Sequence, residues 1–248
     1  MRQNTWLSSL LAVALFVVCV LGCNKPGSGT ANTASTPNSN NSSSTAQQAA
    51  TPFADIAGDY SVVGTNEDGS PYKGALAVIK RGDVYQFRWN AGKPYDGIGV
   101  AHGNVVAVAF AGGSDGKGCG VVSYQILADG TLDGRWGYWG QNESGTETAV
   151  RTGGGSGLVG DYDGTGKNPN GSPYKVKLTI SPRGTGYEFA WSNNSSGFGV
   201  KQGNSLSVGI GGSRCAFVAY EIKPNGMLDG VWGGYGSDRT GTEKATKK

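Results

Sequence analysis

The chain contains one sequence twice, and this duplication constrains the fold more than any other feature. The first copy runs from Gly58 to Glu147 and the second from Gly160 to Glu243. The offset between matching residues falls from 102 near the start to 96 near the end, and it changes only between motifs. Insertions therefore lie in loops, and the positions that both copies keep are candidates for the fold or for a shared function.

Each copy has the pattern of an antiparallel β-meander. Short segments of alternating apolar and polar residues are separated by turn pairs such as Asp68-Gly69 and Asn170-Gly171. Closure into a barrel removes the two exposed edges of such a meander. The predicted fold is all-β, with two tandem small antiparallel up-and-down β-barrels. We expect about eight strands per copy, in the first copy near residues 57–65, 72–80, 84–90, 95–101, 104–110, 120–127, 131–138 and 145–151.

Composition divides the chain into five segments. Residues 1–22 are predicted as a signal peptide and residues 23–52 as a disordered tether, because Ser, Asn, Thr, Ala, Gln and Gly dominate the tether and cannot bury a core. Residues 53–152 are predicted as the first barrel, residues 153–157 as a Gly-rich linker and residues 158–248 as the second barrel.

An aromatic stripe shows which strand faces point inward. Tyr85, Phe87 and Trp89 share one face of their strand and are unchanged in the second copy, whereas the residues between them differ. An eight-stranded barrel is just wide enough to be filled by side chains or to hold one small ligand. The many aromatic residues favour a filled core, and a ligand cavity is the alternative. The same comparison predicts inward side chains at Leu76, Val78, Val106, Val108, Val122, Tyr124, Leu132 and Trp136.

The two copies differ on their outer surfaces. Residues 53–152 hold 8 Lys and Arg against 11 Asp and Glu, whereas residues 157–248 hold 11 against 7. Oppositely charged barrels with an apolar wall are expected to dock on each other, and solvated faces are the alternative. The apolar wall of the first copy consists of Ala75, Ala77, Ile79, Val105, Ala107 and Ala109.

The N-terminus carries an export signal. Arg2 precedes an apolar segment, residues 7–21, which is shorter than the roughly 20 residues that a membrane-spanning helix needs. The segment ends in Val-Leu-Gly-Cys23, which resembles the lipobox of bacterial lipoproteins. The resemblance implies cleavage before Cys23 and lipid attachment to it. An ordinary secretory signal with an incidental cysteine is the alternative. We expect an exported protein that a lipid anchors to the cell envelope, at the outer membrane if the organism has one.

Two further cysteines, Cys119 and Cys215, lie at matching positions of the two copies. An exported protein meets oxidising conditions, so a disulfide between the copies is one expectation. Two free thiols at a buried edge are the other, and from the sequence we favour them. With one cysteine per copy and one histidine in the chain, no metal site is expected.

The sequence offers little support for catalysis. His102 is the only histidine, and Gln202 takes its place in the second copy, so no duplicated histidine site exists. Paired acids could support glycoside hydrolysis, but turn hydrogen bonding is the simpler explanation of the aspartates. We therefore expect no catalytic residues and no cofactor. The acids kept in both copies are Asp59 and Asp161, Asp133 and Asp229, and Glu147 and Glu243.

The repeat unit combines Tyr-x-Phe-x-Trp, Leu-Asp-Gly-x-Trp and Gly-Thr-Glu motifs. Over residues 56–246 it resembles small secreted or lipid-anchored bacterial β-repeat proteins that are often labelled fibronectin-binding. The meander is also similar in architecture to calycin barrels such as avidin, which is a likeness of topology. The resemblance to the β-repeat proteins implies a binding function.

We therefore expect an adhesin-like, lipid-anchored binding protein of the cell envelope without catalysis. Its expected partners are the membrane, through the lipid anchor, and an extracellular protein or an anionic glycan, but not nucleic acid. An envelope structural or assembly factor is the alternative, and a carbohydrate-active hydrolase is a further one. The basic surface of the second copy and exposed aromatic rings make the candidate binding surface: Lys175, Lys177, Arg183, Lys201, Arg214, Trp139, Tyr235 and Tyr95.

Overall fold

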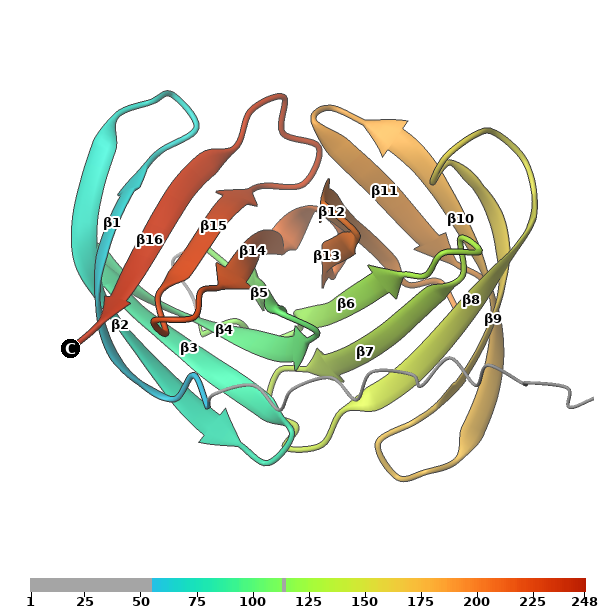
Figure 1. The fold of residues 1–248 in the computed structure, drawn as a ribbon, viewed down its shortest axis with the longest axis horizontal. Coiled ribbons are helices and arrows are strands. Elements are labelled where there is room, and N and C mark those ends of the chain that lie inside the picture. Colours follow the sequence, from blue (N-terminus) through green and yellow to red (C-terminus); the bar gives the residue numbers. More distant parts are fainter. Residues whose placement is uncertain (1–54, 113–114) are drawn as a thin grey trace, which may run out of the picture. The chain divides into compact units, whose positions relative to one another are not determined.

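The computed structural model describes residues 55–112 and 115–248 (Figure 1). The predicted signal peptide, Cys23 and the tether therefore lie outside the described residues. Within the described ranges the chain forms sixteen β-strands and one short 3₁₀ helix. None of the helical structure in this part of the chain is long and apolar enough to cross a membrane.

The strands lie close to the positions that the alternating pattern predicts. In the first copy they are β1 (Gly58–Thr65), β2 (Pro71–Arg81), β3 (Val84–Ala91), β4 (Lys93–His102), β5 (Val105–Phe110), β6 (Gly120–Ile126), β7 (Leu132–Tyr138) and β8 (Gly145–Gly153). In the second copy they are β9 (Gly160–Lys167), β10 (Pro173–Arg183), β11 (Gly186–Trp191), β12 (Ser196–Gln202), β13 (Ser205–Ile210), β14 (Ala216–Ile222), β15 (Leu228–Gly233) and β16 (Gly241–Lys247), with the 3₁₀ helix η1 (Gly212–Arg214) before β14.

The strands close into two antiparallel barrels of eight strands each, which confirms the predicted all-β fold. The first barrel consists of β1–β5 and β14–β16, and the second consists of β6–β13. In Figure 1 the blue-to-green strands β1–β5 and the orange-to-red strands β14–β16 thus build one barrel together. The predicted domain boundaries, 53–152 and 158–248, are therefore wrong. Each barrel takes five strands from one copy and three from the other.

The duplication itself makes this strand exchange feasible. β5 pairs with β14, with Phe110 opposite Ala216, and β13 pairs with β6, with Ile210 opposite Gly120. Because β6 and β14 are copies of one strand, each fits the place that the other would fill in an unexchanged barrel. The arrangement is a domain swap within a single chain.

The exchange also removes the predicted charge difference between the barrels. The first barrel, residues 55–110 and 216–248, carries ten basic and ten acidic side chains. The second barrel, residues 120–210, carries seven of each. Attraction between opposite net charges therefore does not hold the two barrels together.

The inward face follows the prediction. Tyr85, Phe87 and Trp89 are buried in the first core, and Val122 and Tyr124 are buried in the second. Leu76, Val78, Val106 and Val108 also lie in the first core, and Leu132 lies in the second with Trp136 partly buried against it.

Residues that precede the first strand of each copy close one end of each barrel. The Tyr60 hydroxyl donates to the carbonyl of Ile56 at 2.6 Å, and the Tyr162 hydroxyl donates to the carbonyl of Leu158 at 2.8 Å. Ile56 and Leu158 are buried within the respective cores. This end of each barrel is filled, as the aromatic content predicts.

Part of the apolar wall packs between the barrels. Ala107 and Ala109 of the first barrel are buried in a cluster that includes Val121 of the second barrel. The expectation that this wall is an interface is correct for β5. The residues Ala75, Ala77 and Ile79 on β2 stay partly exposed and do not belong to the cluster.

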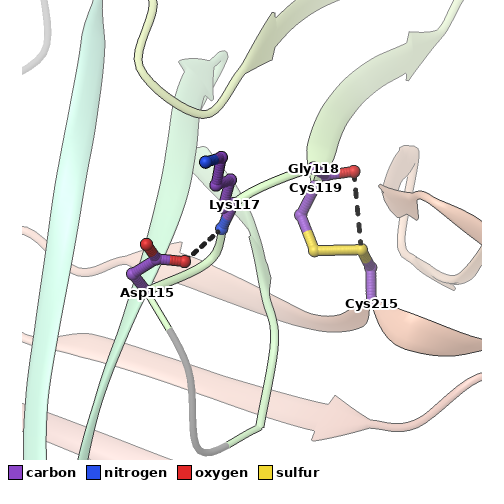
Figure 2. Close-up of a disulfide and its surroundings, with 5 residues drawn as sticks. All are labelled: Asp115, Lys117, Gly118, Cys119 and Cys215. Atoms are coloured by element: carbon purple, nitrogen blue, oxygen red, sulfur yellow. Dashed lines mark hydrogen bonds between the residues drawn. A yellow bond between two sulfur atoms is a disulfide. The ribbon is translucent and has the colours of Figure 1, made fainter.

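A disulfide joins the two places where the chain passes between barrels (Figure 2). Cys119 immediately precedes β6 and Cys215 immediately precedes β14, and their Cα atoms lie 5.8 Å apart. The expectation of two free thiols is therefore wrong. After strand exchange, Cys119 and Cys215 lie at the two points where the chain crosses from one barrel to the other. In the loop before Cys119, the Asp115 carboxylate accepts the backbone N–H of Lys117 at 3.0 Å.

Candidate ligand sites in the barrel mouths

Each barrel is hollow at the end opposite its closed end. The cavity of the first barrel has a volume of about 660 Å³ and that of the second about 330 Å³. Both volumes lie within the usual range for small-molecule sites. The filled-core prediction therefore holds for one end of each barrel, and the cavity alternative holds for the other. We call these cavities the first mouth and the second mouth.

A buried glutamate lies in the lining of the first mouth. Glu243 on β16 accepts the indole N–H of Trp89 at 2.9 Å and the hydroxyl of Tyr72 at 2.7 Å. The hydroxyl of Tyr220 donates to the same carboxylate oxygen as Trp89. Three donors from β2, β3 and β14 therefore converge on one carboxylate, and the strand exchange is what brings Tyr220 and Glu243 to this barrel.

The second mouth repeats this arrangement with equivalent residues. Glu147 on β8 accepts the indole N–H of Trp191 at 3.2 Å and the hydroxyl of Tyr174 at 2.9 Å. Tyr124 donates its hydroxyl to the same glutamate. Both carboxylates are almost fully buried, at 3% exposure for Glu243 and 5% for Glu147. Burying a carboxylate is costly unless it is hydrogen-bonded, so these donors are what keep it in the barrel.

The four tyrosines that donate to the two glutamates remain protonated donors well above neutral pH. Burial raises the pKa of Tyr124 and of Tyr220 far above the usual range, and the neighbouring glutamate raises it further. Burial and then the charge of the glutamate also raise the pKa of Tyr72 and of Tyr174. The polar groups are therefore held in one hydrogen-bonding pattern.

The walls of the two mouths differ. In the first mouth Tyr95 stacks on Trp89 with ring centroids 5.1 Å apart, and Phe110 packs 5.6 Å from Trp89 and 5.3 Å from Tyr95. By sequence alignment of the copies, Ser195 and Ile210 take the places of Tyr95 and Phe110 in the second mouth. The first mouth thus has a cluster of three rings, with Tyr95 stacked on Trp89 and Phe110 tilted against both, that has no counterpart at the matching positions of the second mouth.

One position near the mouths carries residues of very different size in the two copies. Tyr138 lines the second mouth, and the matching residue of the second copy, which belongs to the first barrel, is Gly234. A side chain of tyrosine size is therefore missing from the first mouth. A Cβ built on Gly234 would lie 3.3 Å from the Ser237 hydroxyl oxygen, a tight contact at which the Ser237 side chain would have to shift slightly.

The tryptophans of β7 and β15 also differ in their hydrogen bonds. Trp136 donates its indole N–H to the Tyr174 hydroxyl at 2.9 Å. The indole nitrogen of Trp232 is buried, and within the described part of the chain it has no hydrogen-bond partner. Trp232 packs edge-to-face against Tyr72 and lies over Gly241, whose lack of a side chain leaves room for the indole ring.

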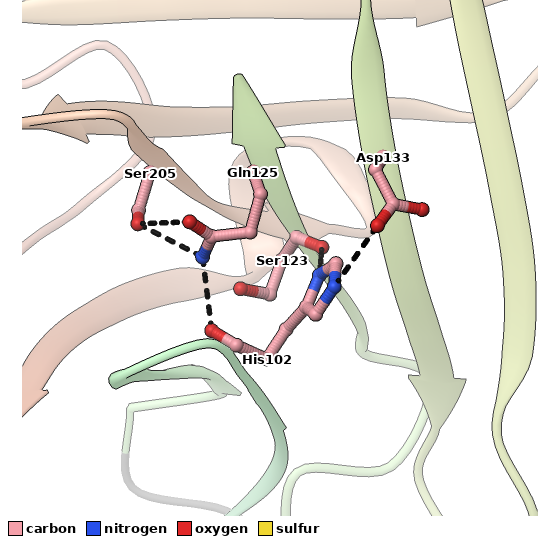
Figure 3. A network of polar contacts seen from close by, with 5 residues as sticks. All are labelled: His102, Ser123, Gln125, Asp133 and Ser205. Carbon is pink, nitrogen blue, oxygen red and sulfur yellow. Dashed lines mark hydrogen bonds and ion pairs between the residues drawn. The ribbon is translucent and has the colours of Figure 1, made fainter. Parts of the chain in front are cut away.

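Neither mouth contains the pair of acids that glycoside hydrolysis uses. Glu243 and Glu147 are each the only carboxylate among the described residues that line their mouths. Asp133 lies instead between the barrels, where its carboxylate is 3.3 Å from Nε2 of His102 (Figure 3). Nδ1 of His102 lies 3.3 Å from the carbonyl oxygen of Ser123, and Gln125 donates to the His102 carbonyl at 2.9 Å. The single histidine therefore connects β4 of the first barrel with β6 and β7 of the second.

The surface residues predicted for binding are distributed over both barrels. Tyr95 lies in the first mouth, and Lys175 lines the second. Lys177 forms an ion pair with Asp163. The remaining candidates are placed as follows: Lys201 on β12, Arg214 on η1, Trp139 against the apolar cluster between the barrels, and Arg183 3.2 Å from Glu188 and over the Tyr235 ring at 4.8 Å.

The sequence comparison indicates the glutamates only as possible acids and, apart from Tyr95, assigns no mouth-lining tyrosine to binding. Tyr72 and Tyr174, Trp89 and Trp191, and Glu147 and Glu243 are nevertheless identical in both copies. An acid kept together with tyrosines and tryptophans on inward positions is a signal that could have identified the site. Among the described residues no group of three or more His, Cys, Asp or Glu side chains could hold a metal ion.

Comparison of the chain with protein-family models, with curated proteins and with solved structures finds no match.

Proposed function

We propose that the protein is a lipid-anchored binding protein of the cell envelope, and that each barrel mouth holds a small ligand or the end group of a larger partner. The anchor rests on Cys23 and its lipobox-like context in the sequence. A sugar unit or a side chain of an extracellular glycan or protein is a partner of suitable size for cavities of about 330 and 660 Å³.

One observation carries this proposal. Both barrels keep the same buried glutamate, hydrogen-bonded by one tryptophan and two tyrosines, beside an aromatic cavity. A polar network inside an otherwise apolar barrel lowers stability unless all its groups are satisfied, so its repetition favours a role in binding. The single carboxylate per mouth favours binding over hydrolysis, since hydrolysis of glycosides uses two acids.

Titration with N-phenyl-1-naphthylamine tests the proposal, because this neutral probe fluoresces strongly when its rings leave water. We expect saturable binding to the wild-type chain at both mouths. Gly234→Tyr places in the first mouth the residue that the second mouth already carries, Tyr138, and should abolish the tighter of the two binding phases.

Tyr138→Gly provides the matched control, because it enlarges the second mouth and should leave binding at the first unchanged. Probe fluorescence that never saturates, or that is the same in Gly234→Tyr and wild type, would show that the mouths are not ligand sites.

A further inference from the structure

The carboxylate in the first mouth has no cationic partner in the described part of the protein. Glu243 takes part in none of the ion pairs there, and its three hydrogen-bond partners are neutral donors. Lys93 is the other charged residue of the lining, and it is exposed at the rim. A buried charge of this kind is stabilised when a group of opposite sign reaches it.

Aromatic rings surround the same cavity. Tyr95 stacks on Trp89 and Phe110 is tilted against both rings. Tyr72 and Trp232 are the other aromatic residues of the lining. The faces of aromatic rings carry partial negative charge and attract cations, tryptophan most strongly. Several rings around a cavity are the arrangement by which proteins recognise quaternary ammonium groups.

We propose that the first mouth binds an organic cation, a substituted ammonium group on a small apolar body, with the rings around the cation and Glu243 supplying the opposite charge. This inference rests on the proposed function and names the ligand class of one of its two sites. A simple apolar ligand would not need the carboxylate or the cluster of rings. An organic cation uses both.

The second mouth is expected to bind the same ligand class more weakly. It keeps Glu147, but its cavity is half the volume, and Ser195 and Ile210 stand where the first mouth has Tyr95 and Phe110. The second mouth therefore offers the charge and as many aromatic residues, but in half the volume and without a ring that matches Tyr95 or Phe110 beside its inner tryptophan, Trp191.

Isothermal titration with a matched pair of ligands tests the proposal on the full chain. Choline carries a trimethylammonium group, and 3,3-dimethylbutan-1-ol has the same shape with carbon in place of the charged nitrogen. We expect choline to bind the wild-type protein roughly tenfold or more tightly than the neutral analogue, because the cation–π and charge interactions are lost in the analogue.

Two variants locate the effect in the first mouth. Glu243→Gln keeps an oxygen that can accept from Trp89 and Tyr220 but removes the charge, and it should weaken choline binding about tenfold while leaving the neutral analogue unaffected. Tyr95→Ser installs the residue of the second copy and should weaken choline binding by several fold through loss of one ring. Glu147→Gln in the second mouth is the matched control and should leave the tight choline phase unchanged.

Equal affinity for choline and the neutral analogue would overturn the cation proposal, and so would an unchanged choline affinity in Glu243→Gln. Binding of N-phenyl-1-naphthylamine separates this failure from failure of the proposed function. If the neutral probe still binds at the mouths, only the ligand class is wrong. If it does not bind either, both proposals are wrong.

Discussion

Cys119 and Cys215 occupy matching positions in the two sequence copies, and their disulfide joins the two segments in which the chain passes from one barrel to the other. The bond spans a sequence separation of 96 residues. It therefore closes a loop that contains the whole second barrel, and it fixes the exchanged arrangement covalently at its crossing points.

Reduction of this disulfide should destabilise the protein. A bond that closes a long loop lowers the entropy of the unfolded chain, so we expect a loss of about 2–4 kcal/mol in the free energy of unfolding. Denaturant unfolding of oxidised and reduced protein measures the difference. The double variant Cys119→Ser, Cys215→Ser is the control and should be insensitive to reductant. Identical midpoints for oxidised and reduced wild type would contradict the prediction.

A single copy should dimerise. A fragment of residues 157–248 contains β9–β16, and two such fragments can rebuild both barrels if the β14–β16 segment of each completes the other. The apolar cluster of Phe198, Val200, Phe217 and Ala219 consists only of residues of this copy, so it would form twice in that dimer. Sedimentation analysis measures the mass. A stable folded monomer would show instead that a copy closes on itself.

Strand positions and inward faces could be predicted from the sequence because they depend on local alternation and turns. The strand that pairs with β5 could not be predicted, because β6 and β14 present the same inward pair of residues. The pair is Val122 and Tyr124 in β6, and Val218 and Tyr220 in β14. Both strands satisfy the alternation equally well. Which of the two strands pairs with β5 depends on the path of the connecting segments, and the hydrophobic pattern does not indicate this path.

The mouths were harder to predict than the fold for a related reason. Tyr72 and Glu243 lie 171 residues apart in the chain, and they meet only because the strand exchange places β16 beside β1 in the first barrel. Each residue by itself looks like an ordinary strand residue. Identity between the copies makes both residues candidates for the fold or for a shared function, but it does not show that they bond to each other.

Removing the buried glutamate should cost far more stability than neutralising it. Glu243→Ala leaves the donors of Trp89, Tyr72 and Tyr220 without their acceptor, so we expect a loss of about 3–5 kcal/mol. Glu243→Gln retains an acceptor and should cost about 1 kcal/mol. Chemical unfolding compares the two, with exposed Glu143→Ala as the control. Equal losses in the alanine and glutamine variants would mean that the hydrogen bonds do not hold the site together.

High pH should unfold the protein cooperatively. The pKa values of Tyr72, Tyr174, Tyr124 and Tyr220 are raised in the folded state, chiefly by burial. Above the ordinary tyrosine pKa of about 10 the unfolded chain loses protons that the folded chain keeps, so the stability that is present below this pH is lost as pH rises. Tyrosinate absorbance and circular dichroism should therefore change together at high pH. Ionisation of all tyrosines while the fold persists would contradict the raised pKa values.

The most direct test of ligand binding in the mouths is the nuclear magnetic resonance spectrum of the tryptophan indole N–H groups during titration with N-phenyl-1-naphthylamine. Trp89, Trp136, Trp191 and Trp232 line the mouths, whereas Trp139 packs against the apolar cluster between the barrels. Tryptophan-to-phenylalanine variants assign each signal. We expect the four mouth signals to shift and saturate while the Trp139 signal stays in place. A shift confined to Trp139, or no saturable shift at any tryptophan, would contradict this expectation.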